Sequence, residues 1–183
     1  MESLNEIPIK LNIGCRDRIM IGYINIDEQE EWRGKKADLV SHPKNLQRFG
    51  DNSISEIISI HYIQYFYYWE IEEILAEWLR VLKPKGKIII ESPNLLTACQ
   101  IITAEPFRAA GPGDASQMSM WCFYGNPGEK NIQMCNRWLF TPQTLIQLMT
   151  GVGYVNLGQE SAEFKLREPR DFRVVGQKAW EEK

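Results

Sequence analysis

The sequence predicts an α/β protein with a central, mostly parallel β-sheet. Two short apolar runs rich in β-branched residues open the chain, at 9–14 and 22–27, and runs of this length and composition predict buried strands. A strongly periodic helical segment at 69–82 is followed by a third run of this kind at 87–94. Strands that alternate with helical segments are typical of parallel sheets with helical crossovers.

The first two strands end in residues that suit a ligand. Residues 9–14 end at Gly14, where the backbone could turn sharply or let a ligand come close, and residues 22–27 end in the carboxylate of Asp27. The connection at 15–21 is short, because a parallel crossover normally needs a dozen or more residues. Either the crossover helix is reduced to a turn or the two strands are antiparallel.

The next part of the chain predicts two further strands. Residues 28–36 are charged and predict an exposed linker or a short helix, and residues 37–40 predict a brief third strand. A loop at 43–50 and a turn at 51–53 then lead into a fourth strand at 55–61, with His61 at its C-terminal tip.

The helix at 69–82 is the clearest element. Its apolar residues recur at steps of three and four, which predicts one buried face. Acidic residues occupy its first turns and Arg80 lies near its end, as the helix dipole favours, and residues 83–86 predict its end before the fifth strand at 87–94. Residues 143–150 predict another helix, with Thr141 as N-cap.

Composition predicts one ordinary soluble domain spanning 1–183. A net charge of −3 gives no electrostatic footprint for DNA or RNA. No apolar run approaches the ~20 residues of a membrane span, and the charged start is unlike a signal peptide, so we expect a cytoplasmic protein. The scattered cysteines and two histidines predict no metal site.

Residues 11–15 (Leu-Asn-Ile-Gly-Cys), followed by 22–27 (Gly-Tyr-Ile-Asn-Ile-Asp), resemble the opening of small class I S-adenosylmethionine-dependent methyltransferases of the type 11 kind. The stretch from Leu75 to Gly86 resembles the same family's "Leu-x-Glu-x-x-Arg-Val-Leu-Lys-Pro-Gly-Gly" block, with Lys85 in place of one glycine. Arg16 stands where the family usually has a second glycine, and a bulky side chain there is expected to crowd the cofactor.

This resemblance implies a Rossmann-like fold with helices on both faces of the sheet, a C-terminal antiparallel strand pair at 154–157 and 170–177, and S-adenosylmethionine as cofactor. It places Asp27 at the ribose hydroxyls and His42 and Leu46 beside the adenine. The loop-rich segment at about 95–137 is expected to form an insertion or lid over the cofactor crevice. The implied cofactor contacts are Asn12, Gly14, Cys15, Asp27, His42, Leu46 and His61.

His61 is the one titratable side chain expected at the acceptor side of the crevice. Gln64 and Tyr65 stand where many family members have Glu-His, so the sequence offers His61 alone as a catalytic residue, or else a structural histidine. The aromatic run at 62–69 is either core packing or a wall that stacks a planar or sugar substrate.

Two functions follow from these observations, and a third is disfavoured. The first is transfer of a methyl group from S-adenosylmethionine to a small-molecule or sugar-linked acceptor. The second is a methyltransferase-fold protein that has lost catalysis and serves as a binding or scaffold partner. A nicotinamide dehydrogenase is disfavoured, because the turn at Gly14 lacks the remaining glycines of a dinucleotide-binding loop.

Overall fold

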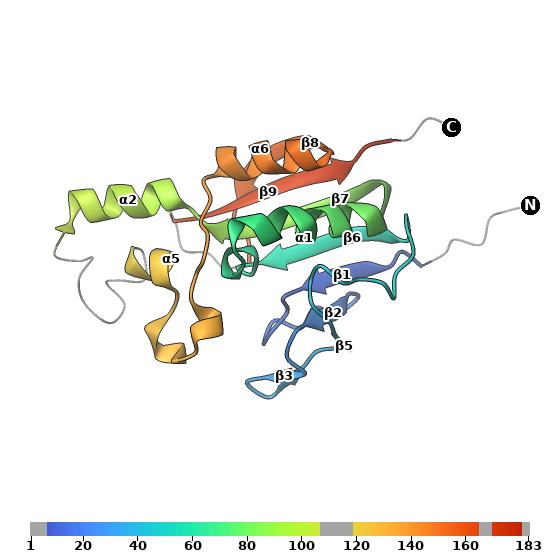
Figure 1. Cartoon of the computed structure of the whole chain (residues 1–183), viewed down its shortest axis with the longest axis horizontal. Helices are drawn as coiled ribbons and strands as arrows, with labels where there is room; N and C mark the ends of the chain where they lie inside the picture. Colours follow the sequence, from blue (N-terminus) through green and yellow to red (C-terminus); the bar gives the residue numbers. More distant parts are fainter. Residues whose placement is uncertain (1–6, 107–118, 165–169, 181–183) are drawn as a thin grey trace, which may run out of the picture.

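The computed structural model describes residues 7–106, 119–164 and 170–180, and its centre is a seven-stranded sheet (Figure 1). The strand order is β5-β2-β1-β6-β7-β9-β8. All neighbouring pairs from β5 to β7 are parallel, whereas β9 is antiparallel to both β7 and β8. The strands are β1 Lys10–Ile13, β2 Ile24–Asp27, β5 Leu39–Val40, β6 Ile54–Ile60, β7 Leu82–Pro93, β8 Tyr154–Ser161 and β9 Asp171–Lys178. The predicted mostly parallel sheet with a C-terminal antiparallel pair is confirmed.

The first two strands are parallel although no helix connects them. Leu11 pairs with Ile24 in a parallel register, and the intervening segment is made of turns. Of the two alternatives that the short connection left open, the reduced crossover is therefore the one adopted.

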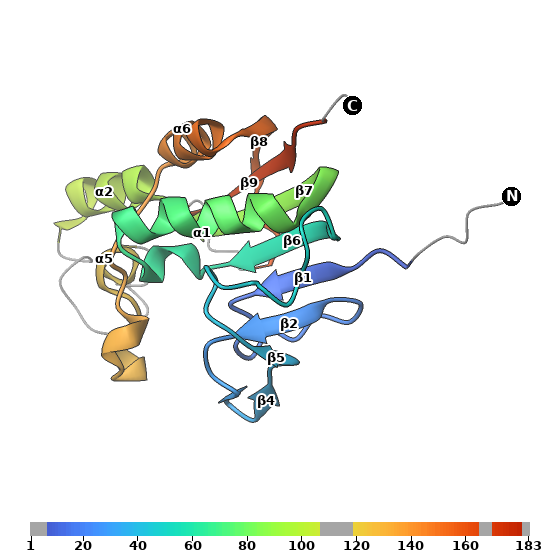
Figure 2. The same ribbon diagram turned by 45° about the vertical axis from the view of Figure 1, so that its right-hand side comes forward.

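Two helices cover one face of the sheet. Helix α1, Tyr68–Val81, lies across β6 and β7, and helix α6, Pro142–Val152, lies beside it (Figures 1 and 2). The buried residues of α1 recur at helical spacing and include Trp78, as the periodicity predicts. The Thr141 side chain accepts a hydrogen bond from the Thr144 backbone N–H, which confirms the predicted N-cap of α6.

The connection between β1 and β2 packs on the second face of the sheet. On the second face, Ile58, Ile60 and Ile89 form a small apolar cluster, and Met20 and Tyr23 from the β1–β2 connection pack against it. A segment too short for a helix thus supplies the cover that a crossover helix would otherwise give.

Three segments differ from their predicted structure. Residues 28–36 contain neither a linker nor a helix but the hairpin of β3 (Glu31–Trp32) and β4 (Lys35–Lys36). Strand β7 already begins at Leu82, so residues 83–86 continue into the strand. The loop-rich region begins with helix α2, Leu95–Ala104, whose first turn is capped by Asn94 Oδ1 accepting from the Leu96 N–H at 3.1 Å.

The remaining short elements gather near the C-terminal ends of β6 and β7 (Figure 2). They are η1 Ile63–Tyr65, α5 Met120–Tyr124, η2 Pro127–Glu129 and η3 Ile132–Met134. No helix in the described ranges has the length and apolar character needed to cross a membrane.

Helix α1 anchors the loop at residues 42–50. Glu77 Oε1 accepts a hydrogen bond from the Leu46 N–H at 2.8 Å, and Arg80 donates to the Phe49 carbonyl at 3.2 Å. The buried Trp78 indole donates to the Pro43 carbonyl at 2.9 Å. These bonds fix the loop that carries His42.

Candidate functional site

Two adjoining cavities lie where the carboxyl ends of β1, β2 and β6 meet, the usual place for a ligand in an open α/β sheet. We call the larger the Asp27 pocket, of about 460 Å³, and the smaller the His61 pocket, of about 240 Å³. Four residues line both cavities and form the wall between them: Arg16, Trp32, Tyr65 and Met134.

Asp27 is held rigidly at the end of β2. Its side chain is 6% exposed, and Oδ2 accepts the Arg16 backbone N–H at 3.0 Å while Oδ1 accepts the Gln29 N–H at 3.1 Å. Each carboxylate oxygen keeps a further lone pair, because an ionised carboxylate offers about four acceptor sites. The group is therefore oriented by the protein and still able to accept from a ligand that enters the Asp27 pocket.

Aromatic side chains form another part of this pocket. The Tyr62 and Phe66 rings meet edge to face with centroids 5.1 Å apart, and His42 meets Phe66 at 5.7 Å. Tyr62 donates from its hydroxyl to Glu28 Oε2 at 3.0 Å, and burial raises the pKa of this phenol well above its ordinary value. Planar rings beside a fixed carboxylate suit a ligand with a planar base and a diol.

Four of the predicted cofactor contacts lie outside the lining of the two pockets. Gly14 has φ +75°, and a Cβ built on it would lie 2.0 Å from Tyr62 Cγ, so the Tyr62 ring covers it. The Cys15 thiol is buried, which raises its pKa to about 12, and Leu46 belongs to the main core. Asn12 binds the Arg18 carbonyl at 2.7 Å and Asn25 Oδ1 at 2.9 Å. Their contact with a cofactor stays a prediction.

Arg16 has a left-handed backbone conformation, with φ +45°. Its guanidinium carbon lies 4.1 Å from the centroid of the Tyr65 ring and 5.6 Å from that of Trp32. Because the side chain stacks on these rings, it forms a partition between the two pockets.

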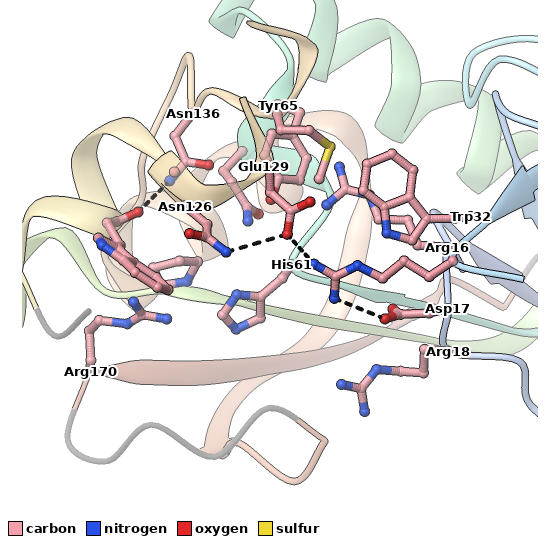
Figure 3. A pocket seen from close by; sticks show the side chains of 16 residues that line it. Arg16, Asp17, Arg18, Trp32, His61, Tyr65, Asn126, Glu129, Asn136 and Arg170 are labelled. Carbon is pink, nitrogen blue, oxygen red and sulfur yellow. Dashed lines mark hydrogen bonds and ion pairs between the residues drawn. The ribbon is translucent and has the colours of Figure 1, made fainter. Parts of the chain in front are cut away.

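His61 lies in the second pocket with an acidic neighbour. It is 4% exposed and has φ +51°, and its Nε2 lies 3.1 Å from Asp171 Oδ2. The other carboxylate oxygen of Asp171 contacts Arg170 Nη2 at 2.7 Å. Figure 3 shows His61 between Arg170 on one side of the pocket and Arg18 on the other.

Sequence reasoning missed Arg170 and Asp171. Arg170 directly precedes β9 and Asp171 is the first residue of that strand. Both lie far along the chain from His61, and only the pairing of β9 with β7 brings them to the site. The one available signal is the charged Arg-Asp pair at the start of the strand.

The described part of the predicted lid supplies one wall of the His61 pocket. Trp121, Asn126 and Asn136 line it, and Glu129 joins this wall to the β3–β4 hairpin through an ion pair with Arg33 at 2.5 Å (Figure 3). Residues 107–118 of the segment lie outside the described residues. Among the described side chains, no group of three or more histidines, cysteines and acids is arranged to hold a metal.

The sequence allows two interpretations of the aromatic run at 62–69, core packing or a wall that stacks a substrate, and the residues of the run differ in where they lie. Tyr62 and Phe66 are buried, and Tyr65 lines both pockets. Tyr67, Tyr68 and Trp69 are exposed, with Tyr67 stacked on Trp69 at 4.6 Å.

Comparison with known proteins points to one fold. Residues 23–90 match the family model of a methyltransferase domain. No curated protein sequence matches the chain.

Among solved structures, an S-adenosylmethionine-dependent methyltransferase of Archaeoglobus fulgidus aligns with a TM-score of 0.65 at 17% identity, over 93% of this chain and 86% of its own. A possible histamine N-methyltransferase of Thermotoga maritima aligns with a TM-score of 0.61 at 18% identity, over 93% and 82%. Phosphoethanolamine N-methyltransferase 2 of Haemonchus contortus, in complex with S-adenosyl-L-methionine, aligns with a TM-score of 0.55 at 11% identity, over 94% of this chain and 49% of that longer protein.

The seven-stranded sheet with its reversed last pair agrees with the fold of these neighbours and with the family match. Residues 23–90 match a methyltransferase-domain model, and the chain as a whole has the fold of the class I S-adenosylmethionine-dependent methyltransferases.

Proposed function

We propose that the protein is a methyltransferase that binds S-adenosylmethionine in the Asp27 pocket and methylates a small-molecule or sugar-linked acceptor in the His61 pocket. The observation that carries this proposal is the hydrogen-bonded, buried carboxylate of Asp27 in the lining of a cavity of about 460 Å³. The family match and the S-adenosylmethionine-bound neighbour support the same cofactor.

The residues of the Asp27 pocket fit the nucleoside half of this cofactor. Its volume falls within the roughly 300–1,000 Å³ typical of small-molecule sites. Asp27 would accept hydrogen bonds from the two ribose hydroxyls, and Phe66 and His42 would flank the adenine. Three carboxylates line this pocket against two arginines, which favours a positively charged ligand.

When bound, S-adenosylmethionine supplies an electrophilic methyl group on a sulfonium. The protein has little covalent chemistry to perform, so its main contribution is to hold the acceptor in line with that group. An acceptor hydroxyl would also need a base. His61 lines the acceptor pocket with Asp171 Oδ2 3.1 Å from its Nε2, so we assign this role to His61 for a hydroxyl acceptor.

The two neighbours named for N-methylation of histamine and of phosphoethanolamine support a small-molecule acceptor. An amine acceptor that is already neutral would need no base, and His61 would then be dispensable for chemistry. Replacement of His61 by Gln separates these cases, because it should lower kcat only for a hydroxyl acceptor and leave cofactor affinity unchanged.

Titration with S-adenosylhomocysteine tests the cofactor proposal. We expect binding to wild type and a loss of about 10- to 100-fold in affinity in Asp27→Asn, since two hydrogen bonds to a charged group are weakened. Glu72→Gln is the matched control, because it also removes one negative charge but lies exposed on α1 and outside both pockets. Thermal unfolding of each variant checks that the fold is retained.

Failure of wild type to bind S-adenosylhomocysteine or S-adenosylmethionine at millimolar concentration would overturn the proposal. The fold would stand, and the non-catalytic binding or scaffold protein would become the better hypothesis. Equal losses in Asp27→Asn and Glu72→Gln would place the cofactor elsewhere.

A further inference from the structure

The charges of the His61 pocket are opposite in sign to those of the Asp27 pocket. Four arginines line it against two carboxylates, Asp17 and Glu129. Both carboxylates are engaged by Arg33, at 3.5 Å and 2.5 Å. The acids of this wall are therefore already paired within the protein.

Two of the arginines lack such a partner. Among the described residues, neither Arg16 nor Arg18 makes an ion pair with a carboxylate, although both are only partly exposed. Arg16 stacks on Tyr65, and Arg18 donates one hydrogen bond to the Phe164 carbonyl at 2.7 Å. Each guanidinium has five N–H donors, so most of their donors remain available for a ligand.

Buried polar atoms also line this cavity. The Gln64 side chain is 1% exposed and lines the pocket, and its Oε1 accepts no hydrogen bond from any described residue. The Trp121 indole N–H, which also lines the pocket, is buried and makes no hydrogen bond within the described part of the chain. Leaving such groups unsatisfied costs roughly 1–3 kcal/mol each, so they indicate a ligand that supplies both a donor and an acceptor.

We infer that the His61 pocket selects a methyl acceptor that carries a carboxylate or phosphate group, which Arg16 and Arg18 bind. The inference rests on the proposed function and narrows it to an acidic acceptor. Guanidinium groups match the planar oxygen pairs of both anions, and a second polar group of the acceptor would donate to Gln64. A volume of 240 Å³ restricts the bound part to a small molecule or to one end of a larger one.

The cofactor offers a second source for such an anion, because its methionine part also ends in a carboxylate. The larger size of the separate Asp27 pocket favours an arrangement in which the cofactor lies there and the His61 pocket remains for the acceptor. The experiment must distinguish these two sources.

Anion titrations of the full chain saturated with S-adenosylhomocysteine provide the test. Inorganic phosphate and glycolate are the probes, glycerol is the uncharged comparator, and ionic strength is held constant. The readout is the NMR shift of the Trp121 indole N–H, assigned with Trp121→Phe. We expect saturable binding of at least one anion and none of glycerol, with affinity lowered at least tenfold in Arg18→Gln and in Arg16→Gln.

Two further variants make the result specific. Arg18→Lys keeps the charge and should retain part of the affinity, whereas Arg48→Gln, an exposed arginine outside both pockets, should bind as wild type does. If Arg48→Gln weakens binding as much as Arg18→Gln, the effect is one of net charge and the inference is wrong.

Replacement of S-adenosylhomocysteine by 5′-methylthioadenosine, which lacks the amino-acid part, separates the two sources. Anion binding with both nucleosides supports an acceptor site. Anion binding with 5′-methylthioadenosine alone would show that the pocket holds the cofactor's own carboxylate, and it would overturn the inference. An absence of anion binding while S-adenosylhomocysteine still binds would also overturn it and leave the proposed function intact.

Discussion

The Tyr62 ring lies against the Cα of Gly14, so close that a methyl group on Gly14 would stand 2.0 Å from Tyr62 Cγ. Gly14 begins the turn after β1, and Tyr62 lies two residues beyond the end of β6. The absence of a side chain on Gly14 therefore serves first to seat the Tyr62 ring.

We expect Gly14→Ala to destabilise the protein by about 3–5 kcal/mol, because it combines left-handed backbone strain with a clash in a packed region. Gly22→Ala is the matched control, since Gly22 has φ +84° and nothing within 4 Å of its built Cβ, and it should cost about 1–2 kcal/mol. Urea unfolding gives both values. Equal losses would show that Tyr62 moves aside at little cost.

Arg16→Gln should change the preference between the two forms of the cofactor. Arg16 lines the Asp27 pocket, and its positive charge opposes the positive sulfonium of S-adenosylmethionine but not the neutral thioether of S-adenosylhomocysteine. We expect the affinity for S-adenosylmethionine to rise by about fivefold relative to that for S-adenosylhomocysteine. Titration calorimetry measures the ratio, and Arg48→Gln should leave it as in wild type. A ratio that falls would contradict an electrostatic role for Arg16.

Glu77→Gln should weaken the protein in a pH-dependent way. Hydrogen bonds from Arg80 lower the pKa of Glu77 below its ordinary value of 4.5. Stability from this carboxylate is therefore fully present above pH 4.5 and is lost as the pH falls through the lower folded pKa. At pH 7 we expect a loss of about 1–2 kcal/mol in the free energy of unfolding, and the difference from wild type should shrink in acid.

The control for this variant is Glu73→Gln on the same helix. Glu73 also contacts the loop at 42–50, through Lys44 at 3.1 Å, but both side chains are exposed. Its loss should cost less than about 0.5 kcal/mol at any pH. A pH-independent effect of Glu77→Gln would mean that the carboxylate contributes through shape alone.

The four thiols should divide into two pairs. Cys99 and Cys135 are exposed, whereas Cys15 and Cys122 are buried, and burial raises the pKa of each of the latter thiols to about 12. Since the thiolate is the reactive form, a disulfide reagent at pH 8 should label two thiols rapidly and all four only in urea. The double variant Cys99→Ser/Cys135→Ser should show no rapid phase. A third rapid thiol in wild type would indicate that Cys15 or Cys122 becomes exposed in the native protein.

Much of the fold could be predicted because the sequence patterns that indicate its strands and helices lie within short segments of the chain. The helical repeat of 69–82 and the β-branched runs before Gly14 and Asp27 are visible within a few residues, and α1, β1 and β2 form there. The β3–β4 hairpin has too few residues and too many charges for an alternating pattern to show. The cover of the second face could not be predicted either, because it depends on how Met20 and Tyr23 pack on β6 and β7.

Some residues of the candidate site could likewise be predicted from local patterns, and others could not. Asp27 and His42 line one pocket and His61 the other, and all three lie in or beside the parallel part of the sheet that the sequence predicts. The positions of Arg170 and Asp171 depend on strand pairing between distant segments, which leaves no local pattern. The contact between Tyr62 and Gly14 depends on side-chain packing between distant segments. A short sequence motif around Gly14 does not predict such a contact.

The place of β9 between β7 and β8 has a consequence for how the protein is made. A ribosome releases the residues of β9 after those of every other strand in the sheet, yet β9 is an interior strand. Until it pairs, the outer edge of β7 has no partner and is open to other chains, and His61 lacks its contact with Asp171. The nascent chain can thus order the half that contains β1, β2 and Asp27 early, while the His61 pocket is completed only after synthesis has passed Lys178.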